Sequence, residues 1–291
     1  QPLIPMPMVN ILSGGAHAAR AVDFQDFLVI PVGAESFKEA IEWASRSRAG
    51  TAEVLSQKGH AVSLVADEGG LGPPLESNRA ALEMLVAGIE RAGLEPGDEV
   101  SIAIDVASTQ FYESGTYKLA SEGRDLKADE LETELGEWCR QFPVISLEDP
   151  CAEDDWDAWE KITKSLGSVQ LLGDDLFVTD FSRVEQGIRR KVANAVLVKP
   201  NQAGTLTAAR RVVEQCKAAG YSPVVSARSG ETEDSWLADI AVGWSAGQIK
   251  VGSTTRSERT AKWNRLLRIE RDLGDEATFA GSHFIGGVAN A

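Results

Sequence analysis

The feature that most constrains the fold is a unit that repeats from residue 101 onward. Short apolar runs each reach a charged residue, at Asp105, Glu148, Asp174, Lys199, Arg228 and Lys250. After Glu148 these positions follow one another at intervals of 26, 25, 29 and 22 residues, which suits one strand, one loop and one helix per unit. The longer interval between Asp105 and Glu148 predicts an insertion.

Amphipathic segments separate the apolar runs, with apolar residues recurring at three- and four-residue spacing. They cover residues 154–167, 180–191, 205–220 and 234–244, and two more helices are predicted upstream at 36–57 and 77–93. Strands that alternate with helices predict a parallel sheet covered on both faces. A strand pair near 9–12 and 26–31 adds a hairpin-like start. We therefore expect an α/β fold, a closed TIM-type barrel, for which 291 residues is a normal length.

An open, doubly wound sheet is the alternative fold, but no glycine-rich nucleotide-binding turn follows a first strand. The net charge of −15 argues against nucleic acid as a partner, because phosphate binding needs a basic face. No apolar run approaches the roughly 18 residues of a membrane span, and no signal peptide is visible. Cys139, Cys151 and Cys216 lack paired spacing, which favours reduced thiols in a cytoplasmic protein. The start at Gln1 rather than methionine suggests a processed or trimmed chain.

The charged strand ends predict an active site, because the carboxyl ends of barrel strands open on one face. Asp105, Glu148 and Asp174 would meet there, and three carboxylates cannot all stay ionised at close quarters without a cation. Oxygen ligands without histidine or cysteine favour Mg²⁺. The alternative is that each acid caps a helix or pairs locally.

Lys199 directly follows the buried run Ala195–Val198 and would lose hydration there. Near Arg228 and Lys250, and partly desolvated, its neutral form would be favoured, so it could act as a base. Arg228 and Lys250 would stay charged and hold an anionic substrate. The alternative is a structural pair of Lys199 with Asp174 or Asp175.

These residues lie within stretches that strongly resemble enolase, the phosphopyruvate hydratase family, in order and spacing over nearly the whole chain. The stretches are "NILSGGAHA", "VADEGGLGP", "AIDVAST", "SLEDPCAEDDWDAW", "GDDLFVT", "LVKPNQAGTL", "SARSGETEDSWLAD" and "GQIKVGSTTRSERTAKWNRLLRIE". Enolase-superfamily sites use a lysine or histidine base with one or two Mg²⁺ ions. The resemblance therefore implies a C-terminal catalytic barrel of the enolase kind, with Mg²⁺ as its cofactor.

The resemblance also implies individual roles. It gives Asp105, Glu148 and Asp174 as the Mg²⁺ ligands. It gives Lys199 as the base that takes the C2 proton of 2-phosphoglycerate, and Glu68 as the acid that assists departure of the C3 hydroxide. For substrate binding it implies Lys250 at the carboxylate, Arg228 with Ser229 at the phosphate, His17 in the pocket lining, and Asp26 at a position where the family has a glutamate.

Three departures from the family pattern affect this interpretation. Ala227 stands where the family has a histidine, which puts the dehydration step or the leaving group in question. Asp26 is one methylene shorter than the family's glutamate, which would weaken any contact with Lys199. The usual N-terminal capping domain is expected to be absent or trimmed, with residues 1–278 forming the barrel and 279–291 a loosely ordered tail.

The leading prediction is a phosphopyruvate hydratase-like carbon–oxygen lyase of glycolysis acting on a small anionic phosphorylated substrate. One alternative is a specialised paralogue acting on a related phospho- or phosphono-carboxylic acid, such as a carboxyphosphonoenolpyruvate synthase. The other is a non-catalytic barrel, but such a barrel would have no reason to keep the six charged residues at the strand ends, whose burial costs free energy. Enolases commonly assemble through a surface that the capping domain helps to build, so a homo-oligomer is expected for a full-length form, and this chain could be monomeric.

Overall fold

Eight strands close into a barrel in the computed structural model, which describes residues 1–287. Around the ring they are β10 (Ala195–Val198), β11 (Ser222–Ser226), β12 (Gln248–Gly252), β2 (Met6–Ser13), β3 (Asp26–Ile30), β4 (Ser101–Asp105), β8 (Val144–Glu148) and β9 (Gln170–Gly173). Every repeated apolar run thus forms a barrel strand. The predicted α/β barrel is confirmed.

One strand of the barrel runs against all the others. β3 pairs antiparallel with both β2 and β4, whereas every other neighbouring pair is parallel. This is the predicted hairpin-like start. Because β3 is reversed, its first residue lies at the carboxyl ends of its neighbours, and Asp26 is in register with Asp105 at the end of β4.

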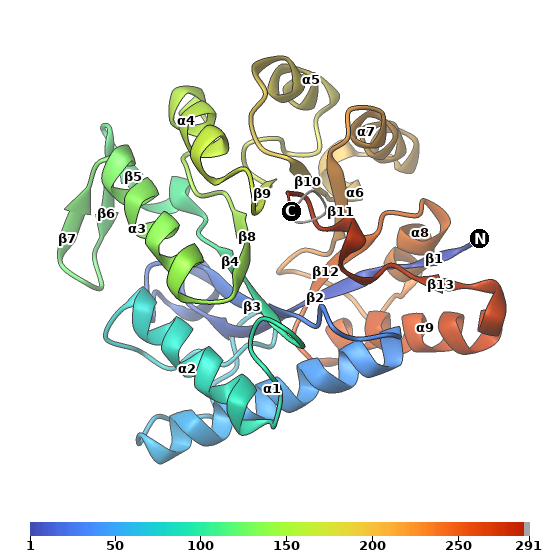
Figure 1. Ribbon diagram of the computed structural model, residues 1–291, viewed down its shortest axis with the longest axis horizontal. Helices are drawn as coiled ribbons and strands as arrows, with labels where there is room; N and C mark the ends of the chain where they lie inside the picture. Colours follow the sequence, from blue (N-terminus) through green and yellow to red (C-terminus); the bar gives the residue numbers. More distant parts are fainter. Residues whose placement is uncertain (288–291) are drawn as a thin grey trace.

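The helices surround the strands in a ring (Figure 1). They are α1 (Phe37–Gln57), α2 (Asn78–Arg91), α3 (Ala128–Gln141), α4 (Trp156–Leu166), α5 (Phe181–Arg190), α6 (Pro200–Ala203), α7 (Leu206–Ala218), α8 (Trp236–Gly243) and α9 (Ser257–Leu273). Polar side chains begin several of them: Ser36, Ser77, Asp155, Asp180 and Thr205 each accept a hydrogen bond from a first-turn amide. Such caps satisfy amides that the helix leaves without partners.

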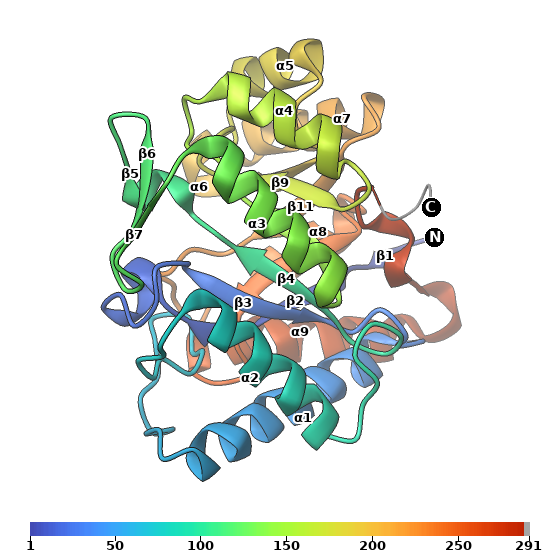
Figure 2. The same cartoon turned by 60° about the vertical axis from the view of Figure 1, so that its left-hand side comes forward.

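The predicted insertion between β4 and β8 contains a small antiparallel sheet followed by α3. Its strands are β5 (Tyr112–Glu113), β6 (Thr116–Leu119) and β7 (Arg124–Leu126). Figure 2 shows this sheet beside α3 and outside the barrel. Aromatic rings attach the insertion to the core, since Phe111 stacks on the buried Phe24 and also packs, with Tyr112, against the buried Tyr117.

Two apolar layers hold the barrel together. The inner layer fills the barrel and consists of Met6, Met8, Leu28, Ile30, Ala103, Leu172, Ala195, Leu197, Val224 and Ile285. The larger outer layer lies between strands and helices. Strands that are buried on both faces read as continuous apolar runs, which is why the sequence shows them so clearly.

The end of the chain returns to the barrel. β13 (Thr278–Phe279) pairs with β1 (Leu3–Ile4), and Ile285 is fully buried in the inner layer. Residues 288–291, the rest of the predicted tail, lie outside the described residues. The loosely ordered tail and the boundary at 278 stay predictions.

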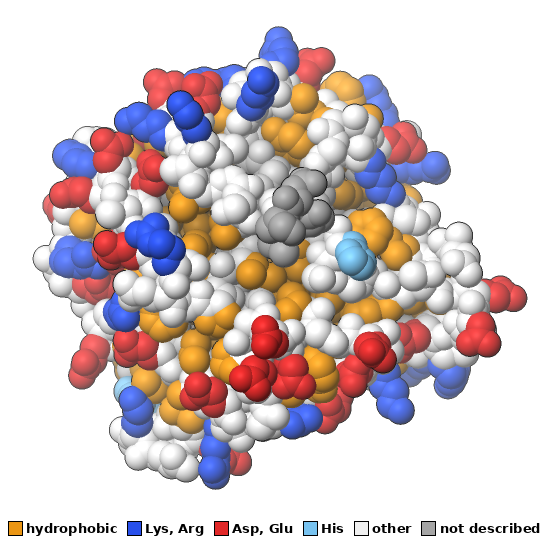
Figure 3. Space-filling model, in the orientation of Figure 1, with side chains coloured by type: hydrophobic (Ala, Val, Ile, Leu, Met, Phe, Trp, Pro, Cys, Tyr) orange, Lys and Arg blue, Asp and Glu red, His pale blue; other side chains and the backbone are white. Residues whose placement is uncertain are grey.

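No helix within residues 1–287 is both long and apolar enough to span a bilayer. The three cysteines are free thiols, with Cys151 and Cys216 buried. The net charge of −15 shows on the surface, where acidic side chains gather in the lower half of the face in Figure 3.

Candidate functional site

A polar pocket of about 160 Å³ opens at the carboxyl ends of the barrel strands. It is lined by His17, Gln25, Glu68, Asp105, Ala107, Gln110, Asp149, Asp174, Asp175, Lys199, Ser226, Ala227, Arg228, Ser229 and Lys250. Eight of the ten predicted site residues are in this lining. The other two, Asp26 and Glu148, are buried and bonded to lining side chains. The structure therefore brings the predicted residues together.

Lys250 lies between two of the predicted metal ligands. Its Nζ donates to Asp105 Oδ2 at 2.8 Å and to Glu148 Oε2 at 2.6 Å, and all three side chains are buried. Burial alone would lower the pKa of Lys250, but the two carboxylates raise it well above its usual value. Lys250 also lies inside β12, which continues to Gly252, and not at a strand end.

Lys199 is held by Asp174 through an ion pair between Nζ and Oδ2. Burial favours the neutral amine, yet Asp174 and Glu148 outweigh burial and the nearby Lys250, so the pKa of Lys199 is raised. The prediction that the surroundings favour neutral Lys199 is wrong for this structure. Sequence reasoning counted neighbouring cations, but Asp174 and Glu148 affect the lysine more strongly than Lys250 does.

A second acidic cluster adjoins the first. Oxygens of Asp149, Asp174 and Asp175 lie within 4.8 Å of one another, whereas Asp105 and Glu148 share Lys250. Asp149 has a positive φ of 41°, and its carboxylate accepts from the amides of Asp174 (3.1 Å) and Asp175 (2.7 Å). Sequence reasoning missed Asp149 as a site residue and weighed Asp175 only as a structural partner. The signal that could have found them in the sequence is that each is the second of two adjacent acids, "ED" at 148–149 and "DD" at 174–175.

The acidic residues fit a hard divalent cation. Asp174 Oδ1 and Glu148 Oε1 are buried oxygens without a hydrogen-bond partner. Burial and neighbouring acids raise the pKa of Glu148 and Asp149 well above the usual range, and that of Asp175 to about 6. A buried carboxylate that lacks a partner is costly, and oxygen ligation to Mg²⁺ would compensate it.

His17, Asp26 and Glu68 form another group of neighbouring side chains at the site, with polar atoms within 4.8 Å of one another. Asp26 Oδ1 accepts from Asn10 Nδ2 at 2.5 Å and from Ser13 Oγ at 2.7 Å, and Oδ2 lies 2.8 Å from His17 Nδ1. Burial would lower the pKa of His17, but Asp26 outweighs it and raises the pKa to about 9. The short side chain of Asp26 thus contacts the histidine, where sequence reasoning considered only Lys199.

Glu68 is nearly buried, and its Oε2 has no hydrogen-bond partner. Burial first, and then the charge of Asp26, raise the pKa of Glu68, although Lys250 and His17 act in the opposite direction. The protonated form of Glu68 is therefore favoured relative to an exposed glutamate. A protonated carboxyl group can serve as a general acid.

Gln25 and Gln110 were missed by sequence reasoning. Gln110 Nε2 donates to Gln25 Oε1 at 2.5 Å, and Gln25 Nε2 donates to Asp105 Oδ2 at 3.1 Å. This chain of amides fixes one oxygen of Asp105. The adjacency of Gln25 to Asp26 in "FQDF" was the only signal for it.

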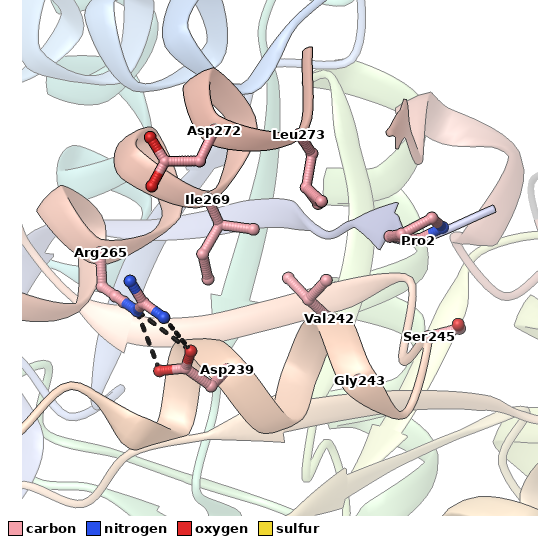
Figure 4. A pocket seen from close by; sticks show the side chains of 9 residues that line it. All are labelled: Pro2, Asp239, Val242, Gly243, Ser245, Arg265, Ile269, Asp272 and Leu273. Atoms are coloured by element: carbon pink, nitrogen blue, oxygen red, sulfur yellow. Dashed lines mark hydrogen bonds and ion pairs between the residues drawn. The ribbon is translucent and has the colours of Figure 1, made fainter. Parts of the chain in front are cut away.

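A larger groove of about 480 Å³ lies away from this chemistry, between α8, α9 and the first residues of the chain. Figure 4 shows Val242, Ile269 and Leu273 in its lining, and it shows Arg265 and Asp239 pointing toward each other. They bond at 2.5 and 3.0 Å, so these two charged groups of the groove satisfy each other. The strand-end pocket is therefore the candidate site.

Comparison with known families agrees with this site. A family model described as "Enolase, C-terminal TIM barrel domain" matches residues 1–287. The chain belongs to this enolase family. Its buried acidic cluster of Asp149, Asp174 and Asp175 is suited to metal binding within an enolase barrel. Family membership supports enolase-type catalysis and leaves the substrate open.

Proposed function

We propose that the chain is a Mg²⁺-dependent lyase that removes the proton beside the carboxylate of 2-phosphoglycerate and eliminates water to give phosphoenolpyruvate. The observation that carries the proposal is the single pocket that combines a candidate base, a candidate acid, an anion-binding pair and an acidic metal-binding cluster. Such a combination suits enolisation, because proton removal places negative charge on carboxylate oxygens that cations then stabilise.

Lys199 is the proposed base, and its neutral amine accepts the proton that leaves C2. Bound Mg²⁺ would supply positive charge close to the carboxylate oxygens of the substrate. Asp174 would hold it, together with the neighbouring acidic residues Asp149, Asp175, Asp105 and Glu148. A cation held by Asp174 would offset the carboxylate charge that raises the pKa of Lys199, and the neutral amine would then be accessible. Lys250 binds the substrate carboxylate in this proposal.

Glu68 is the proposed acid of the second step. The electron pair left on C2 forms the double bond to C3, the C3–O bond breaks, and the leaving hydroxide takes the proton of Glu68 to become water. The raised pKa of Glu68, caused mainly by burial, supports this role. Arg228 and Ser229 line the pocket where they would hold the phosphate. Cytoplasmic glycolysis is the proposed setting.

The deciding experiment is turnover of 2-phosphoglycerate with Mg²⁺, followed by absorbance of the enol product. We expect turnover with Mg²⁺ and its loss when a chelator removes the metal. A separate thermal-unfolding series tests metal binding, since a ligand at 100 times its Kd stabilises a protein by about 2.7 kcal/mol. Asp174→Asn should lose this stabilisation.

Ala227 favours a second candidate, a specialised enolase-like paralogue. Its methyl group lines the pocket at a position where the family has an imidazole, so a bulkier phospho- or phosphono-carboxylic acid would find room there. Turnover of such an acid without turnover of 2-phosphoglycerate would support this candidate, for example carboxyphosphonoenolpyruvate synthesis. Ala227→His should then lower the turnover of that acid. Absence of Mg²⁺ binding and of turnover would support the remaining alternative, a non-catalytic barrel.

A further inference from the structure

Two buried cations on α9 contact the loops of the pocket without lining the pocket. Arg259 and Lys262 are both fully buried. Neither appears in the pocket lining, and most of their hydrogen bonds go to backbone carbonyl oxygens. A buried charge costs free energy unless polar groups compensate it. Here carbonyl groups of the site loops provide the compensation, together with ion pairs from Arg259 to Glu258 (3.8 Å) and from Lys262 to Glu231 (3.1 Å).

Arg259 bonds to two loops that come from distant parts of the chain. Nη1 donates to the carbonyl of Arg228 at 2.6 Å, and Nη2 donates to the carbonyl of Ser229 at 2.5 Å. Nη2 also lies 3.3 Å from the carbonyl of Asp67, the residue before Glu68. One planar guanidinium thus joins the loop of the proposed phosphate-binding pair to the loop of the proposed acid.

The contact with the Glu68 loop is reinforced at close range. The amide of Ser253 donates to the carbonyl of Glu68 at 2.8 Å, and Thr255 Oγ1 donates to the carbonyl of Gly69 at 2.7 Å. A Cβ at Gly252 would lie 2.8 Å from Arg259 Cδ and 2.7 Å from the carbonyl oxygen of Glu68. The arginine, the β12–α9 connection and the Glu68 backbone are therefore packed without spare room.

We propose that Arg259 is a positioning residue that fixes Glu68 relative to Arg228 and Ser229. The inference rests on the proposed function for the roles of these three residues. The substrate must present its leaving group to Glu68 while its phosphate stays on Arg228 and Ser229, so the spacing of the two loops determines the geometry of elimination. A lysine cannot replace the guanidinium, because its single ammonium lacks the fork that spans both loops.

Lys262 provides a matched control on the same helix. Its Nζ donates to the carbonyls of Thr232 at 2.8 Å and Asp234 at 2.9 Å and pairs with Glu231 at 3.1 Å. It therefore holds the far part of the Arg228 loop, and none of its bonds reaches the Glu68 loop. Removing either cation should cost stability, but only loss of Arg259 should uncouple the two loops.

The test compares Arg259→Lys with Lys262→Met below both unfolding temperatures. We expect Arg259→Lys to lower kcat about 10²-fold, because misplacement by about 1 Å has this effect, and to weaken binding of inorganic phosphate. Hydrogen exchange should rise in both 66–70 and 227–231. Lys262→Met should raise exchange in 231–235 and leave 66–70 protected.

Arg259→Gln serves as a second variant if Arg259→Lys does not fold, since it keeps a planar amide without the charge. An even rise in exchange across the barrel, or a kcat within threefold of wild type, would overturn the proposal. Exchange and phosphate binding do not depend on turnover. Failure of wild-type turnover would therefore count against the proposed function, while the exchange pattern would still decide the role of Arg259.

Discussion

The two ends of the barrel solve the problem of buried polar groups in opposite ways. At the amino end, Gln170 and Gln248 bond each other at 2.8 and 3.1 Å. The same two amides also engage Ser146, the carbonyl of Phe284 and the amide of Gly286. All of these groups are neutral, and the network is closed by the returning chain end.

At the carboxyl end most of the buried polar groups are charged. Glu68, Glu148 and Asp174 each leave one buried carboxylate oxygen without a hydrogen-bond partner. Native proteins satisfy nearly all buried polar atoms, and clusters of perturbed acids are typical of functional sites. The difference indicates that the amino end serves stability, whereas the carboxyl end gives up stability to keep groups available for a ligand.

The largest expected effect is on catalysis at the carboxyl end. Lys199→Met should lower kcat for 2-phosphoglycerate by about 10²–10⁴-fold, because it removes the proposed general base. Steady-state kinetics at a temperature below unfolding measures this. Lys164→Met, an exposed lysine of α4, should leave kcat unchanged. If the kcat of Lys199→Met lay within tenfold of the wild-type value, the carboxyl end would not be distinguished from the amino end by a catalytic role.

The amino end should respond in stability alone. Ile285→Ala should destabilise the protein by about 2–5 kcal/mol, because it opens a cavity in the inner layer. Chemical denaturation measures the loss, and kcat/KM of the folded fraction should not change. A large loss of kcat/KM would show that the two ends are coupled.

Removing one acid from the carboxyl end should stabilise the metal-free protein. Burial and Asp174 raise the pKa of Asp175 to about 6, so its ionised form opposes folding at neutral pH. Asp175→Asn should therefore gain about 1–3 kcal/mol at pH 7 without divalent cations. The gain should vanish below about pH 4, where the unfolded chain is also protonated. Destabilisation by Asp175→Asn at neutral pH would contradict the conclusion that the ionised carboxylate of Asp175 opposes folding.

The smallest expected effect is a change in the pKa of His17. NMR should give a pKa of about 9 for His17, and Asp26→Asn should lower it toward the usual 6.5. Because the folded pKa is raised, the stability that this pair contributes is complete below about pH 6.5 and is lost as pH rises through about 9. An unchanged His17 pKa in Asp26→Asn would show that another group holds the imidazolium.

Sequence patterns predicted the strands of the barrel and the gathering of Asp105, Asp174 and Lys199 at one end. They succeeded because fully buried strands leave continuous apolar runs, and because strand direction fixes where the following residue lies. The reversed β3 also brought Asp26 to that end, as the hairpin-like start allowed.

The pairing of charges could not be predicted in the same way. Whether Lys250 bonds to Asp105 or to substrate depends on distances of a few tenths of a nanometre, which periodicity does not encode. The turn at Asp149 depends on a local backbone conformation. Arg259 acts on carbonyl groups, and every residue has one, so the sequence carries no signal for its partners.

Closure of the barrel by pairing β12 with β2 has a consequence for how the protein is made. Gln248 pairs with Met6, so the ring cannot close before β12 has left the ribosome, long after β2 has emerged. Such distant contacts slow folding, and an unclosed sheet presents unpaired edges to neighbouring chains. We expect nascent chains that stall before β12 to depend on chaperones, and chains that extend beyond α9 to be released from that dependence.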